Sequence, residues 1–143
     1  MLLGVDPLLN GELLKILDEM GHGDQLLVVD RNYPATSSGR PVVRLGDVTV
    51  SRAIEAILSV FPLDTFVDRP LERMESETAD ASHADSQSEV LAVAQAAHPR
   101  SLEFTTLPRR DFYERARSAF AVVHTLEARP YSCYILQKGV IEA

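Results

Sequence analysis

Cysteine is nearly absent from this chain of 143 residues, and tryptophan is absent altogether. A single cysteine, Cys133, excludes a framework of intramolecular disulfides and fits a reducing compartment. Basic residues are also scarce: 14 Lys and Arg stand against 21 Asp and Glu, which gives a formal net charge of −7. Nucleic-acid binding needs a clustered basic surface, so the sequence predicts no nucleic-acid partner.

Long apolar runs are missing as well. No stretch approaches the roughly 18–20 residues that a membrane helix needs, and the N-terminus lacks the basic and apolar regions of a secretory signal. We therefore expect a soluble, cytoplasmic protein with no membrane partner. The composition, 45% hydrophobic and 24% charged, is ordinary for a globular protein. The length suits one core, and residues 1–143 are predicted to form a single domain.

Helical and extended patterns alternate along the chain. Apolar spacing and capping signals predict helices over 12–20, 51–61, 90–97 and 111–120. Short runs rich in β-branched and other apolar residues predict strands over 25–29, 41–45, 102–105, 121–125 and 134–136. This alternation favours an α/β sheet covered by helices. Residues 72–89, in which Glu, Asp, Ser, Thr and Ala dominate, are expected to be a solvated surface segment or mobile insertion.

A histidine between two glycines is the first candidate functional group. His22 lies between the first expected helix and the strand over 25–29, which stops at Asp30. Gly21 and Gly23 allow positive φ and a close approach to a small ligand. Histidine titrates near neutral pH, and a carboxylate accepts hydrogen bonds. Taken alone, however, such a histidine more often only hydrogen-bonds its own turn.

The other candidate side chains also have ordinary structural explanations. Arg109 fits a solvated surface charge, and Tyr113 fits a packing residue with its hydroxyl in water. Cys133 has no adjacent histidine and no second thiol, so a nucleophilic role is not indicated. The sequence has no zinc signature, P-loop, dinucleotide fingerprint or serine elbow. We therefore expect no metal site.

The motifs are more specific together than separately. They occur in the order Met20-Gly21-His22-Gly23-Asp24, Asp30 with Tyr33-Pro34-Ala35, Phe61-Pro62-Leu63-Asp64, Phe112-Tyr113-Glu114-Arg115-Ala116, and Tyr131 with Lys138-Gly139-Val140. Over essentially the whole chain, this set resembles the fucose mutarotase branch of the family that also contains ribose pyranase. The ribose branch is less similar, because it tends to carry threonine where Gly23 stands and lacks the Phe-Tyr-Glu-Arg-Ala run.

The resemblance implies a three-layer α/β/α sandwich around a mixed sheet, and an enzyme that interconverts the anomers of a free monosaccharide without a cofactor. Family members form ring-shaped decamers with sites near subunit contacts, so a homo-oligomer is expected. Carried over by position, His22 matches the family's proton donor, and Tyr113 is assigned to catalysis with it. Positions that bind or approach the sugar match Asp30, Asp64, Arg109, Tyr131, Ser132 and Cys133.

One position departs from the family pattern. Relatives usually carry asparagine, in a Tyr-Gly-Asn or Tyr-Ala-Asn triplet, where this chain has Cys133. A carboxamide donates and accepts hydrogen bonds well, whereas a thiol does both weakly. The leading hypothesis is a mutarotase for L-fucose or a similarly configured aldose. The alternatives are a ribose-pyranase-like isomerase and a non-catalytic sugar-binding or regulatory protein.

Overall fold

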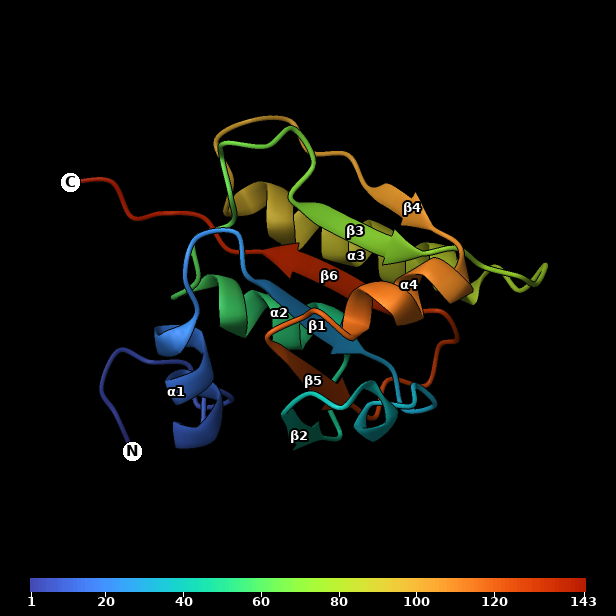
Figure 1. Cartoon of the computed structure of the whole chain (residues 1–143), viewed down its shortest axis with the longest axis horizontal. Helices are drawn as coiled ribbons and strands as arrows, with labels where there is room; N and C mark the ends of the chain where they lie inside the picture. The colour runs from blue at the N-terminus through green and yellow to red at the C-terminus, as the bar shows by residue number, and fades with distance from the viewer.

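The computed structural model describes all 143 residues and contains one six-stranded sheet with four α-helices. The strand order is β2-β5-β1-β6-β3-β4, so β1 lies inside the sheet, parallel to β5 and antiparallel to β6 (Figure 1). In chain order the elements are α1 (Gly11–Glu19), β1 (Gln25–Val29), the 3-10 turn η1 (Thr36–Ser38), β2 (Val42–Gly46), α2 (Val50–Leu58), β3 (Leu71–Met74), α3 (Ser82–Ala96), β4 (Thr105–Leu107), α4 (Arg109–Ala116), β5 (Ala121–Thr125) and β6 (Tyr134–Gln137).

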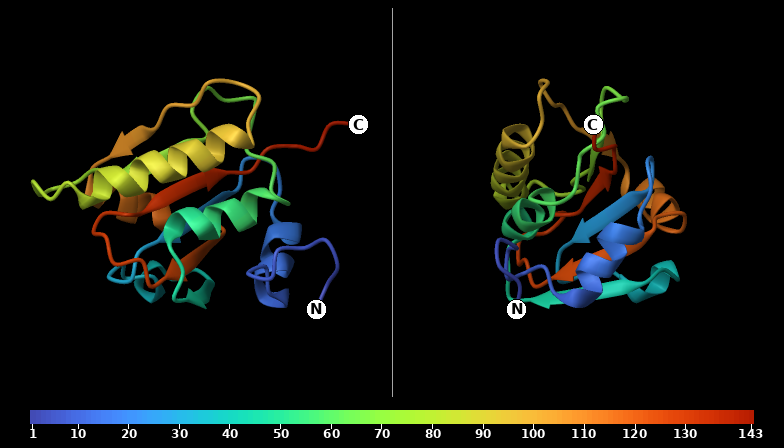
Figure 2. Two further views of the ribbon diagram at one scale, coloured as in Figure 1. Left: turned by 180° about the vertical axis from the view of Figure 1, so that it is seen from behind. Right: turned by 90° about the vertical axis from the view of Figure 1, so that its left-hand side faces the viewer.

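Three helices cover one face of the sheet. Because side chains alternate along a strand, Leu26 and Val28 of β1 point to this face, where they join Leu13 of α1, Ile54 of α2 and Val90 of α3 in one core. All five side chains are fully buried. Figure 2 shows α2 and α3 together on this side of the sheet.

The opposite face carries one helix, α4, together with the loop after β1. Phe112 of this helix is fully buried in a second, smaller core with Leu27 and Val29, the other two apolar positions of β1. The right-hand view of Figure 2 separates the three layers, with α4 across the sheet from α3. The predicted three-layer α/β/α sandwich around a mixed sheet is therefore confirmed.

The segment over 72–89 keeps the expected solvated surface, since only Met74 and Ser86 are buried in it, but it is not an insertion, because it forms most of β3 and the first half of α3. β3 pairs with β6 and β4, and its end residues Leu71 and Met74 are buried. α3 begins at Ser82 and packs against α2, with Ser86 fully buried. A four-residue strand shows no clear alternation, and small side chains let α3 pack closely without a bulky apolar stripe. The loop over 75–81, which joins the two elements, is largely exposed.

The remaining elements differ from expectation mainly at their ends. The strand expected over 102–105 lies at Thr105–Leu107, and the helix expected over 111–120 is α4, Arg109–Ala116. The strands over 25–29 and 121–125 are confirmed with the expected bounds. The longest helix, α3, has 15 residues, and none of the helices has the length and apolar character needed to cross a bilayer.

Candidate functional site

The predicted site residues form two groups at opposite ends of β1. His22 precedes this strand and Asp30 follows it, so the strand separates them by roughly 17 Å at about 3.3 Å per residue. Figure 1 shows the turn after α1 and the loop after β1 on opposite sides of the molecule. Asp64 lies with His22, whereas the group around Asp30 contains Arg109, Tyr113, Tyr131, Ser132 and Cys133.

The Asp30 pocket, at the carboxyl end of β1, has a volume of about 450 Å³. Sites for small molecules usually have volumes of roughly 300–1,000 Å³, so a monosaccharide is within its capacity. Its walls combine polar groups with aromatic side chains. The lining residues are Asp30, Asn32, Tyr33, Met74, Thr78, Asp80, Arg109, Tyr113, Pro130, Tyr131 and Cys133.

Asp30 is buried, and only 5% of its surface is exposed. Its Oδ1 accepts a hydrogen bond from the Asn32 N–H at 3.0 Å, and its Oδ2 accepts from the Ser132 N–H at 3.2 Å. Burial raises the pKa of Asp30, and these hydrogen bonds offset only part of that effect. A carboxylate of raised pKa accepts a proton more readily near neutral pH, which suits both hydroxyl binding and proton transfer.

Aromatic rings form one wall of the Asp30 pocket. The ring of Tyr33 meets those of Phe112 and Tyr113 edge-on, at centroid distances of 5.7 and 5.5 Å. The guanidinium of Arg109 lies 6.0 Å from the Tyr113 ring centroid, and its Nε donates to Glu77 at 3.1 Å. Burial raises the pKa of Tyr33 well above its ordinary value, so its hydroxyl stays protonated.

Tyr131 has an unusual backbone conformation for its residue type. It is the one non-glycine residue with positive φ, at 58°. The left-handed region costs such residues about 1–2 kcal/mol, and strained positions of this kind cluster at functional sites. Tyr131 lines the Asp30 pocket, while the next residue, Ser132, turns its side chain into the protein interior and is fully buried. Ser132 therefore reaches Asp30 through its backbone N–H.

Cys133 closes the base of the pocket beside Asp30. Its surface is 2% exposed, and its Sγ donates to Oδ2 of Asp30 at 3.5 Å. Burial raises the pKa of the thiol well above its ordinary value, and the nearby Asp30 charge adds to the effect. Cys133 is thus a neutral, weak hydrogen-bond donor at this pocket and not a thiolate nucleophile.

The second group, which we call the His22 cluster, consists of His22, Asp64, Phe66 and Gln137. Nε2 of His22 lies 3.3 Å from Oδ1 of Asp64, and 45% of the histidine side chain is exposed. The Phe66 ring packs on the imidazole at a centroid distance of 5.1 Å. When Nε2–H donates to Asp64, Nδ1 is left free to exchange a proton with a substrate.

Asp64 is also buried, with 1% of its surface exposed. Burial alone raises its pKa, but hydrogen bonds from the Phe66 N–H at 2.9 Å, the Gln137 amide at 2.8 Å and His22 hold the pKa below its ordinary value. Asp64 therefore stays ionised and orients the imidazole. It is placed to act through His22 and does not line the Asp30 pocket.

Two glycines fix the His22 cluster. Gly23 has φ of 87°, and its N–H donates to the Lys138 carbonyl at 2.8 Å, which ties the histidine turn to the segment after β6. Gly139 packs so closely on Asp64 that a Cβ would lie 2.7 Å from the aspartate Cα. Any larger residue at 139 would displace Asp64, so both glycines of the motif pattern have a structural requirement.

Several pocket residues were not found from the sequence. Thr78 and Asp80 come from the loop over 75–81, inside the segment that was expected to be a surface insertion. Asn32, Met74 and Pro130 have side chains that are common in turns and strands, so no sequence signal distinguishes them. In the His22 cluster, Phe66 and Gln137 were also missed. No three His, Cys, Asp or Glu side chains converge to hold a metal ion.

The sequence and the fold both match known proteins. The model of the RbsD / FucU transport protein family matches residues 3–141. A protein named L-fucose mutarotase, from Haemophilus influenzae (strain 86-028NP), is 38% identical over 140 residues, which cover 98% of this chain and 97% of that protein.

Two solved structures are similar over nearly their whole length. The structure of FucU from Bifidobacterium longum has a TM-score of 0.91 and 38% identity, covering 97% of this chain and 99% of that one. The structure of the fucose mutarotase in complex with L-fucose, from Streptococcus pneumoniae, has a TM-score of 0.89 and 32% identity, covering 99% of this chain and 100% of that one.

Proposed function

The chain belongs to the RbsD / FucU family, and we propose that it is a cofactor-independent mutarotase that interconverts the α and β anomers of L-fucose or a similarly configured aldose. The observation that carries the proposal is a pocket of monosaccharide size built around a buried carboxylate, Asp30. The near full-length similarity to a protein named L-fucose mutarotase supports the choice of reaction and sugar.

The chemistry of the Asp30 pocket suits a sugar. Asp30 can accept hydrogen bonds from neighbouring hydroxyls, and the guanidinium of Arg109 can donate to sugar oxygens. The rings of Tyr113 and Tyr131 offer apolar surface to the C–H face of a pyranose and hydroxyls to its rim. A 6-deoxy sugar such as fucose presents both kinds of surface.

The reaction needs only proton transfer. An acid protonates the ring oxygen while a base removes the proton of the C1 hydroxyl, so that the C1–O5 bond breaks and an open-chain aldehyde forms. Rotation about the C1–C2 bond then presents the other carbonyl face, and the hydroxyl at C5 adds to it while both protons return. Acid–base assistance of this kind is worth roughly 10²–10⁴-fold.

His22 can take part only if a second copy of the chain brings it to the Asp30 pocket, because the two lie at opposite ends of β1. We therefore propose a homo-oligomer, a decamer by family resemblance, in which each site combines the Asp30 pocket of one subunit with the His22 cluster of a neighbour. Phe66, against the imidazole, is 67% exposed, so its ring is available for a contact with a neighbouring subunit.

The single cysteine supports a proposal for the cellular compartment. One buried free thiol fits a reducing environment, and we place the reaction in the cytoplasm.

The weak donor at Cys133, where relatives usually carry asparagine, favours a second candidate within the same fold: a relative that binds the sugar with altered preference or without turnover.

Magnetisation-transfer NMR between anomers separates these candidates. We expect the protein to accelerate exchange of L-fucose more than exchange of D-ribose, and His22→Ala to reduce the effect by about 10²-fold. Acceleration of D-ribose alone would assign a ribose-pyranase-like activity. Binding without acceleration for any aldose would identify a non-catalytic binder and would overturn the proposed function.

A further inference from the structure

The loop over 126–133 joins β5 to β6 and carries three residues at the Asp30 pocket. Tyr131 and Cys133 line this pocket, and Ser132 contacts Asp30 itself. Its conformation is unfavourable in isolation, because Tyr131 adopts the left-handed region. Such a residue keeps its conformation only when contacts on both sides fix the chain. After Tyr131 in the chain, the Ser132 N–H and the Cys133 thiol donate hydrogen bonds to Asp30.

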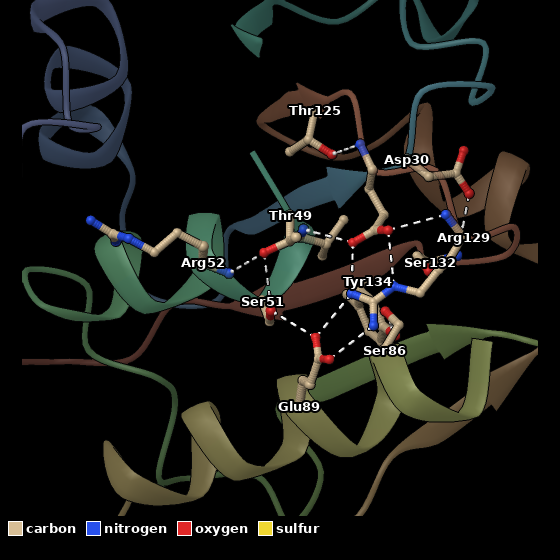
Figure 3. Close-up of polar contacts among 12 residues, drawn as sticks. Asp30, Thr49, Ser51, Arg52, Ser86, Glu89, Thr125, Arg129, Ser132 and Tyr134 are labelled. Atoms are coloured by element: carbon tan, nitrogen blue, oxygen red, sulfur yellow. Dashed lines mark hydrogen bonds and ion pairs between the residues drawn. The ribbon is translucent and has the colours of Figure 1, made fainter. Parts of the chain in front are cut away.

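Before Tyr131 in the chain, the loop is held by Arg129. Its guanidinium makes paired hydrogen bonds with two carboxylates, at 2.9 and 2.8 Å to Glu127 and at 2.9 and 2.9 Å to Glu89. Figure 3 shows Arg129 beside Glu89 of α3, and the Ser132 contact with Asp30 nearby. Paired contacts with the planar guanidinium fix direction as well as distance, which a lysine ammonium cannot do.

Glu127 connects this arrangement to the rest of the fold. Its carboxylate accepts from the N–H of Val50, the first residue of α2, at 3.3 Å and from the N–H of Arg129 at 3.0 Å. The backbone carbonyl of Glu127 accepts a hydrogen bond from the N–H of Arg31 at 3.2 Å, and Arg31 directly follows Asp30 in the chain. The loop is therefore fixed to α2, to α3 and to the end of β1 at once.

The charge cluster is buried to an unusual extent for a loop. The Glu127 side chain is 4% exposed and that of Arg129 is 21% exposed. Even for paired charges, the cost of removing them from water can exceed the attraction between them, so the cluster adds little to the net stability of the fold. Its geometry instead specifies one conformation of the loop. Arg129 does not line the Asp30 pocket, whereas the next two residues, Pro130 and Tyr131, do.

We propose that Arg129, held by Glu127 and Glu89, is a positioning residue for the sugar site, because it sets the left-handed turn at Tyr131 and so places Tyr131, Ser132 and Cys133 against Asp30. This inference rests on the proposed function for its effect on sugar binding. It assigns no direct contact between Arg129 and the sugar. A charge cluster between α2, α3 and the loop thereby sets the affinity of the pocket.

Three variants test the proposal. Glu89→Gln removes half of the charge pairing at an exposed position, where the side chain is 47% exposed, so the fold is retained. Arg129→Lys keeps the charge but loses the paired geometry. The double change Glu127→Gln with Arg129→Met removes both buried charges and leaves neither one unpaired.

Arg52→Met is the matched control. Arg52 lies on α2 and pairs with Asp6 at 2.8 Å, so it is also a partly buried arginine that holds a separate segment. In Figure 3 its side chain points away from Arg129 and Glu89. Its loss is expected to lower the melting temperature without changing the 126–133 loop.

The readouts are KM and kcat for anomer exchange, and the rate at which the native protein's single cysteine, Cys133, reacts with a chromogenic aromatic disulfide. The buried thiol reacts only when the loop opens, so its rate reports local opening. For the double variant we expect KM and the thiol rate each to rise about ten-fold or more, with smaller changes in Arg129→Lys and Glu89→Gln. Arg52→Met keeps wild-type values of both.

A lower melting temperature with wild-type KM and thiol rate, in the double variant or in Glu89→Gln, would show that the cluster is only structural and would overturn the proposal. A wild-type protein that exchanges no aldose would instead reject the proposed function. The thiol rates would still decide in that case whether Arg129 holds the loop.

Discussion

Two buried aspartates, Asp30 and Asp64, lie at opposite ends of the sheet with 5% and 1% of their surfaces exposed, yet their pKa values shift in opposite directions. Burial raises the pKa of both. At Asp30, which receives a thiol in addition to backbone N–H groups, burial outweighs the donors; at Asp64, which receives a side-chain amide and an imidazole, the donors outweigh burial. The balance between burial and donors therefore decides the direction in which each pKa shifts.

The two ends therefore have different chemical capacities. Asp64 remains charged and orients His22, which suits a fixed support for a proton donor. Asp30 is only partly compensated, so it is better prepared to exchange a proton or to accept hydroxyl donors from a ligand. In the proposed mutarotase, a proton donor with its support and a hydroxyl-binding carboxylate form the two halves of a site, and each chain carries both halves, at opposite ends of β1.

Of the substitutions at these two ends, Asp30→Asn should have the largest effect on anomer exchange. The amide cannot take a proton and binds hydroxyls with altered polarity, so we expect anomer exchange to fall by roughly 10²–10⁴-fold in saturating L-fucose. Because the folded pKa of Asp30 is raised, its ionised form costs stability as pH rises through that pKa. The variant should therefore melt at the same temperature as wild type or higher at neutral pH. A clear fall in melting temperature would contradict this account of Asp30.

Asp64→Asn tests the other end and should have a smaller effect on rate. The imidazole keeps a hydrogen-bond partner but loses the charge that orients and stabilises it, so exchange should fall about ten-fold. The folded pKa of Asp64 is lowered, so its stabilising contribution is present at neutral pH and lost as pH falls below about 4. The wild-type advantage in unfolding free energy, about 2 kcal/mol at pH 7, should shrink in acid. Chemical denaturation at several pH values measures this difference.

Cys133→Asn makes the two ends more alike and should have the smallest effect. An amide donor in place of the thiol gives Asp30 the kind of partner that Gln137 gives Asp64, so we expect the pKa of Asp30 to fall toward its ordinary value. The acid limb of the exchange profile should then move to lower pH, and the relative rates for L-fucose and other aldoses should change a few-fold. An unchanged pH profile and unchanged relative rates would show that Cys133 does not set the behaviour of Asp30.

Much of the fold could be predicted from the sequence, because β1 and β5 are short apolar runs bounded by turns and α1 and α2 have regular apolar stripes. β3 and α3 could not, since their buried faces are built from few or small side chains in a segment of acidic composition. The same segment hid Thr78 and Asp80 from the predicted site. A polar stretch that stays on the surface can still line a pocket when the fold brings it there.

The motif order identified residues at both ends of β1 but not their separation. His22 and Asp30 are close in sequence, and the resemblance assigned them to one site. A five-residue strand between them keeps them apart within one chain, and the sequence does not specify how copies of the chain associate. If His22 acts on a sugar held by Asp30, as we propose, each site therefore needs two subunits.

Mixing two inactive variants tests that requirement most directly. His22→Ala and Asp30→Asn are each purified, mixed in equal amounts, dissociated and reassembled, and anomer exchange of L-fucose is measured by NMR. If neighbouring subunits share each site, about one quarter of the sites regain both wild-type residues, and about a quarter of the wild-type rate should return. If the rate stays at the level of the separate variants after verified reassembly, no site combines His22 of one subunit with Asp30 of another, and the central claim is contradicted.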